Sequence, residues 1–114
     1  MNKQIAEQWS AALQSGEYAQ GGFMLLCNNQ FCCLGVLCDL HAKETGNNWV
    51  GVEESNERKY LNESGFLPRE VMNWAEMNSN TGSFGGTTLA YLNDNTGLSF
   101  KSIAGIIDKN WMHL

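Results

Sequence analysis

An unbroken apolar run from Phe31 to Cys38 constrains the fold of this chain more than any other feature. A second run, Phe23 to Cys27, precedes it, and neither approaches the roughly 20 residues that cross a bilayer. Such short runs belong in a folded core, where a buried strand and a buried helix look alike. Leu34, Leu37 and His41 recur at helical spacing, so we predict a helix for the second half of 31–43, ended by Gly46.

Length and composition predict one domain spanning residues 1–114. The chain is 43% hydrophobic and carries 4 Trp, 5 Phe and 3 Tyr, enough for one core. The fold class we expect is α+β, with about four helices packed on a small antiparallel sheet. Asn28-Asn29 should turn a hairpin, and residues 46–65 should form an extended connection with one or two short strands. The clearest helical segments are 2–15, a helix starting at Leu67-Pro68, Thr87 to Asn93, and a helix capped by Ser99.

The charge of the chain argues against a long nucleic acid as its partner. The net charge is −5, and the seven Lys and Arg residues are scattered, so a basic binding face is missing. Gly97 to Ile107 resembles the first helix of a helix-turn-helix, but no basic second helix follows. A small anion could still be held by backbone N–H groups and one cation. The N-terminal residues lack the apolar region of a signal peptide, which favours the cytoplasm over a membrane or secreted location.

Four cysteines, at 27, 32, 33 and 38, raise the question of zinc or catalysis. Zinc sites favour pairs of cysteines with two residues between them, in glycine-rich or polar turns, whereas these cysteines lie among Phe, Leu and Val. We therefore expect free, buried thiols and no metal or other cofactor. Cys38 could still meet His41 on one helix face as a nucleophile and base, but no third group or oxyanion-hole motif accompanies them.

The aromatic residues divide into core and ligand candidates. Trp9 and Trp74 lie on helix faces otherwise made of aliphatic residues, which favours the core for both. Tyr18 stands in a predicted loop between Gly16 and Gly21-Gly22, where no core requires it. Because purine rings are bound by stacking on aromatic side chains, a loop tyrosine flanked by glycine is a candidate ligand contact.

Asn93-Asp94 ends a predicted helix and precedes Thr96-Gly97. Asn and Asp commonly build turns, and this is the simpler interpretation. The other interpretation is a polar pair that reads the edge of a base, since a carboxylate accepts well from guanine N–H groups. The residues alone leave both interpretations open.

Four segments resemble a large group of short phage proteins, in the same order along the chain. They are Trp9-x-x-Ala12-Leu13-x-Ser15-Gly16-x-Tyr18-x-Gln20, Phe31 to Leu40 (FCCLGVLCDL), Gly65-Phe66-Leu67-Pro68-x-x-Val71-x-x-Trp74, and Leu89-Ala90-x-Leu92-Asn93-Asp94 with Ser99-Phe100-x-x-Ile103-Ala104. This group resembles the anti-CBASS sponge proteins. The resemblance implies an oligomeric phage protein in the host cytoplasm that sequesters a cyclic dinucleotide defence signal without cleaving it.

From the residues and the resemblance together we expect a nucleotide pocket and no catalytic residue. The pocket should form where the Tyr18 loop meets the Trp74 helix and the Asn93-Asp94 turn, and its ligand-binding residues should be Tyr18, Gln20, Trp74, Thr87, Asn93 and Asp94. Many aromatic side chains on a short chain favour a homo-oligomer, a dimer or a tetramer. Two other functions remain open: a phage protein that inhibits a host protein through its surface, and a cysteine-dependent hydrolase.

Overall fold

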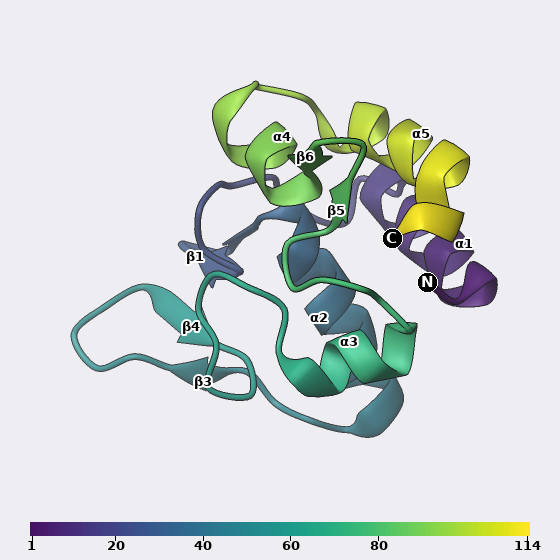
Figure 1. Ribbon diagram of the computed structural model, residues 1–114. Coiled ribbons are helices and arrows are strands. Elements are labelled where there is room, and N and C mark those ends of the chain that lie inside the picture. The colour runs from purple at the N-terminus through teal and green to yellow at the C-terminus, as the bar shows by residue number, and fades with distance from the viewer.

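Helix α2 (Cys33–Thr45) is the central element of the computed structural model, which describes residues 1–114 (Figure 1). Its first two turns are buried on every side, as the apolar run requires. Gly46 ends it in a left-handed conformation with φ +78°, as predicted. The predicted helix was right in type, but it begins at Cys33 and therefore occupies most of the apolar run.

Gly35 allows α2 to lie directly against the preceding chain. A Cβ at this position would stand 1.9 Å from the backbone oxygen of Leu25, well inside van der Waals contact. Leu25 is fully buried, and Gly35 is buried as well. Only glycine fits this approach of the helix to the loop that leads into the sheet.

Helices α1 (Lys3–Gln14) and α5 (Phe100–Asn110) lie side by side, and α1 packs against α2 (Figure 1). Trp9 of α1 is fully buried, and its indole N–H donates to the Cys33 carbonyl at 2.9 Å. Ser99 caps α5 as predicted, since its side chain accepts the N–H of Ser102. A short 3-10 helix, Trp111–His113, follows α5 where a recognition helix would have to stand.

The four-stranded sheet is antiparallel, with the strand order β2-β1-β4-β3. Asn28 and Asn29 join the first two strands with φ of +54° and +61°, the two left-handed residues of a primed hairpin turn. This hairpin is confirmed, and residues 46–65, for which one or two short strands were predicted, contain two. The strands are β1 (Leu26–Cys27), β2 (Gln30–Phe31), β3 (Val50–Gly51) and β4 (Glu57–Lys59).

The segment from 83 to 95 differs from the prediction at its start. Thr87-Thr88, the start of the predicted helix from Thr87 to Asn93, is not helical but forms β6, which pairs with β5 (Ser83–Phe84). Helix α4 (Leu89–Asn95) starts later, because Thr88 turns its hydroxyl to cap the N–H of Tyr91. Helix α3 (Arg69–Ala75) likewise begins one residue after Pro68.

These elements make a single α+β domain of five α-helices, a four-stranded antiparallel sheet and a two-stranded sheet, which confirms the predicted fold class. None of the helices has the length and apolar character needed to cross a membrane.

Candidate functional site

An open cleft of about 340 Å³ lies where the loop before β1 meets the end of α4. Three of the predicted site residues, Gln20, Asn93 and Asp94, line it together with backbone of the glycine-rich loop. Its complete lining is Gln20, Gly21, Gly22, Asn93, Asp94, Gly97 and Leu98. The structure therefore brings together two segments that are more than seventy residues apart in the sequence.

Asn93 is buried beneath the cleft and has all its hydrogen bonds within the protein. Its Oδ1 accepts from the Gln20 side chain at 3.0 Å and from the Cys33 backbone N–H at 3.2 Å. Its Nδ2 donates to the Gly21 carbonyl at 2.9 Å and to Asp94 at 2.8 Å. A side-chain amide with two acceptor and two donor bonds has no capacity left for a base, so Asn93 holds the fold together.

Gln20 is committed in the same way. Its Nε2 donates to the Leu98 carbonyl at 2.8 Å as well as to Asn93, and its Oε1 accepts the N–H of Phe100 at 3.0 Å. The loop is thereby fastened to the first turn of α5. Gln20 shapes the floor of the cleft and positions its neighbours rather than reading a ligand.

Phe23 follows the last loop glycine that lines the cleft, and the sequence analysis did not name it as a ligand candidate. Its ring is 65% exposed, and its backbone is left-handed with φ +69°, a conformation rare for a bulky side chain. The Asp94 carboxylate holds it there, because Oδ1 accepts the Phe23 N–H at 2.8 Å. The signal was present in Gly21-Gly22-Phe23, a glycine-flanked loop aromatic of the kind that had directed attention to Tyr18.

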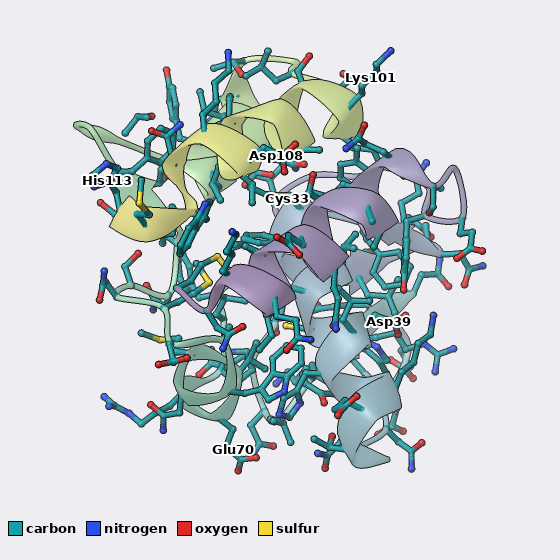
Figure 2. The ribbon with its side chains drawn as sticks, turned by 90° about the vertical axis from the view of Figure 1, so that its right-hand side faces the viewer. Cys33, Asp39, Glu70, Lys101, Asp108 and His113 are labelled. Atoms are coloured by element: carbon teal, nitrogen blue, oxygen red, sulfur yellow. The ribbon has the colours of Figure 1, made fainter.

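Asp94 is the one carboxylate that lines the cleft, and the N-terminal end of helix α5 nearby carries a lysine. Helix α5 begins two residues after Leu98, and Lys101 in its first turn is exposed. Figure 2 shows Lys101 at this end of α5, with Asp108 farther along the same helix. The N-terminal end of a helix and a lysine both favour negative charge nearby.

Tyr18 lies in a different place and is bound by the protein itself. Its hydroxyl donates to Asp39 at 2.6 Å and accepts from Lys43 at 3.0 Å, while its ring packs edge-on against Phe31. Burial raises the pKa of Tyr18, and the hydrogen bond to Asp39 raises it further. Tyr18 thus secures the loop to α2 instead of offering a free ring to a ligand.

Asp39 also forms part of a second open cleft, of about 320 Å³. Its lining is Asp39, Ala42, Lys43, Gly46, Asn47, Asn48 and Trp49. Both oxygens of Asp39 are engaged, one by the indole N–H of Trp49 at 3.1 Å and the other by Tyr18 and Lys43. The charged groups of this cleft are therefore paired with each other.

The predicted pocket of Tyr18, Trp74 and Asn93-Asp94 does not exist as one site. Its parts contact helix α2 at different positions along its length. Asn93 is hydrogen-bonded to the first residue of the helix, Cys33, and Tyr18 is hydrogen-bonded to Asp39. The ring of Trp74 packs against that of His41, with the ring centroids 5.1 Å apart. Cys33 and His41 are about 12 Å apart along a helix. Trp74 lines a third hollow beside α1, and Thr87 lies in β6.

The thiols and the buried histidine have environments that suit a core. Burial raises the pKa of Cys32 to about 11 and raises those of Cys33 and Cys38 well above the usual thiol range. Cys33 lies inside the molecule behind α1 (Figure 2). His41 is buried with its Nδ1 2.6 Å from the Tyr60 hydroxyl, and burial lowers its pKa.

The same side chains do not gather into a metal site. No group of three or more His, Cys, Asp or Glu side chains lies close enough together to hold a metal ion. Cys32 and Cys33 share the start of α2 but are separately embedded in the core, and Cys27 is half-buried in β1.

Comparison with known proteins gives one match. A family model described as a domain of unknown function, DUF8296, matches residues 1–111. No curated protein and no solved structure matches the chain.

Proposed function

The chain belongs to the DUF8296 family, and we propose that it is a phage protein that binds a cyclic dinucleotide defence signal and sequesters it without cleaving it. The cleft between the Gly21-Gly22 loop and Asp94 is the proposed binding site. The proposal joins the chemistry of this cleft to the resemblance of the chain to phage sponge proteins. We propose further that it acts in the cytoplasm of the host cell.

One observation carries the proposal: the exposed Phe23 ring is held in a strained conformation. A bulky residue in left-handed backbone costs about 1–3 kcal/mol, and such strain gathers at binding sites. Burying the ring would have favoured folding, yet it is 65% exposed. Gln20, Asn93 and Asp94 form a hydrogen-bonded network, and Asp94 accepts the Phe23 N–H, so the backbone that carries the exposed ring is fixed in advance. A nucleobase stacks on such a platform for about 1–3 kcal/mol.

A cyclic dinucleotide matches the other groups around the cleft. One base would stack on Phe23 with its polar edge toward Asp94, and a phosphate would lie toward the first turn of α5 and Lys101. The ligand has two bases and two phosphates in two-fold arrangement, so two copies of the chain would bind it symmetrically. The proposed assembly is accordingly a dimer or a pair of dimers.

Sequestration without cleavage fits the chemistry of the side chains. The buried thiols of Cys32, Cys33 and Cys38 are held protonated, and a thiol attacks only as its thiolate. His41 is buried and forms its hydrogen bond with the Tyr60 hydroxyl, not with any of these thiols. None of these three thiols is therefore the activated nucleophile that the hydrolase interpretation requires.

Binding to a host protein stays the second candidate, because apolar side chains are exposed near the same cleft. Met24 and Phe66 join Phe23 on neighbouring chain segments, since the Leu25 N–H bonds to the Ser64 carbonyl at 2.7 Å. Tyr91, one turn before Asp94 on α4, is also exposed. Exposed apolar side chains that lie close together are typical of protein-binding surfaces.

A retention experiment separates these functions. The purified protein is incubated with a panel of cyclic dinucleotides, freed of unbound ligand by gel filtration, and denatured by heat. Release of intact ligand supports sequestration, release of altered ligand indicates an enzyme, and no retention contradicts the proposal and favours a protein partner.

The role of Phe23 is tested in the same assay. Phe23→Ala should weaken binding about 5- to 150-fold, the equivalent of one stacked base. Met112→Ala is the matched control, because Met112 is equally exposed but lies in the C-terminal 3-10 helix. Equal affinity of Phe23→Ala and wild type would contradict the placement of the site.

A further inference from the structure

Among the side chains that line the cleft, the carboxylate of Asp94 keeps one oxygen without a partner in the protein, Oδ2. Asp94 Oδ1 is used twice, by the Phe23 N–H at 2.8 Å and by Asn93 Nδ2 at 2.8 Å. Oδ2 makes no hydrogen bond within the protein, and Asp94 is only partly buried. The amides of Gln20 and Asn93 have no free N–H donor beside it, since all four donor positions bond within the protein.

We propose that Asp94 makes this cleft selective for guanine bases, an inference that rests on the proposed nucleotide-binding function. An ionised carboxylate only accepts hydrogen bonds. The Watson–Crick edge of guanine presents two adjacent donors, N1–H and N2–H₂, which an unpartnered carboxylate oxygen accepts with charge-assisted strength. Adenine presents its N1 lone pair beside N6–H₂, which sets an acceptor against the carboxylate.

The geometry ties this selection to the stacking platform. The same carboxylate that would accept from the base edge holds the backbone N–H of Phe23 through its other oxygen. Asp94 therefore holds the backbone of Phe23 through one oxygen and presents its other oxygen beside it, and the bond from Asn93 positions Asp94 in turn. A base that stacks on Phe23 is thereby offered an acceptor and no donor from these side chains.

Asp94→Asn tests the selection while leaving the local structure in place. The asparagine Oδ1 can still accept from Phe23 and Asn93, and only the free oxygen becomes a donor. Asp108→Asn makes the same change of charge on the exposed side of α5 and serves as the matched control (Figure 2). Circular dichroism confirms that each variant is folded.

The measurement is calorimetric titration with cyclic di-GMP and cyclic di-AMP. Wild type and Asp108→Asn should bind the guanine ligand at least 10-fold more tightly than the adenine ligand. Asp94→Asn should lose at least 10-fold in affinity for the guanine ligand and bring the ratio close to one. Phe23→Ala should weaken the binding of both ligands and leave the ratio of their affinities unchanged.

The outcomes separate this inference from the function on which it rests. Equal binding of both ligands by wild type, or a guanine preference that survives in Asp94→Asn, overturns the base selection and leaves sequestration standing. Failure of wild type to bind either ligand overturns the proposed function, and the selection with it.

Discussion

Asn93 caps helix α2 from across the fold, because its side-chain oxygen accepts the N–H of Cys33 at 3.2 Å, sixty residues away. The residue before the helix, Cys32, makes no side-chain capping bond of its own. The first N–H groups of a helix lack partners within it, and in the core they must find one elsewhere. The same asparagine holds the glycine-rich loop, so one side chain positions both the central helix and the proposed site.

Replacing Asn93 should therefore destabilise the whole protein. Asn93→Ala leaves the Cys33 N–H and the Gly21 carbonyl without partners in a buried place, and should lower the free energy of unfolding by about 2–4 kcal/mol. Denaturant unfolding measures it. Asn95→Ala, at the exposed end of helix α4, which also contains Asn93, should change the free energy of unfolding by less than about 0.5 kcal/mol. Equal effects of the two substitutions would disprove the capping role.

Two helical glycines should respond to alanine in opposite directions. Gly35→Ala drives a methyl group into the Leu25 carbonyl and should cost at least about 3 kcal/mol or prevent folding. Gly105→Ala in α5 meets no atom within 4 Å and should stabilise the protein by about 0.5–1 kcal/mol, because alanine favours a helix. Thermal unfolding of both variants gives the answer. A harmless Gly35→Ala would show that α2 does not lie this close to Leu25.

Stability should fall in mild acid because of His41. Burial lowers the pKa of His41 in the folded state, despite the opposing charge of Glu70, whereas the unfolded chain has the ordinary pKa of about 6.5. As the pH drops below about 6.5 the unfolded state takes up the proton first, so stability is full above this pH and declines below it. His41→Gln should flatten the decline near pH 6, measured by urea unfolding at a series of pH values.

His113 provides the control for this pH dependence. It is exposed in the 3-10 helix, so His113→Gln should keep the wild-type decline. A decline that is the same in His41→Gln and wild type would show that His41 does not cause the pH dependence.

The cysteines should behave as inert core residues. At neutral pH, iodoacetamide should modify half-buried Cys27 first and leave Cys32, Cys33 and Cys38 unmodified until the chain is unfolded in guanidinium. Peptide mass spectrometry identifies the modified sites. Elemental analysis should find no stoichiometric zinc, and one zinc per chain would overturn this account. Cys32→Ser should cost about 1–3 kcal/mol, since it buries a hydroxyl.

The protein should associate in solution. Phe23, Phe66 and Tyr91 are aromatic side chains that the single chain leaves exposed, and association would cover part of this surface. Light scattering at micromolar concentration should give the mass of two or four chains. A monomer mass would count against the two-fold binding of a cyclic dinucleotide.

The sequence by itself determined the features that depend on neighbouring residues. Asn28-Asn29 can adopt left-handed backbone, so the hairpin between β1 and β2 was predictable. Gly46 as the end of α2 and Ser99 as the cap of α5 follow from the same local chemistry. The apolar run from Phe31 to Cys38 required burial, which placed three of the four cysteines in the core.

Only the tertiary structure decided what the polar and aromatic residues of the loops do. Tyr18 and Asn93 were ligand candidates in the sequence, but both bond to residues 21 to 73 positions away. The hydroxyl of Tyr18 is bonded to α2, and the side-chain amide of Asn93 has all its hydrogen-bonding capacity used within the protein. Thr87-Thr88 became a strand because Ser83-Phe84 lies beside it. Phe23 is exposed because Asp94, 71 residues later, holds its backbone. Long-range hydrogen bonds leave no periodic trace in a sequence, since they depend on how the helices and loops pack.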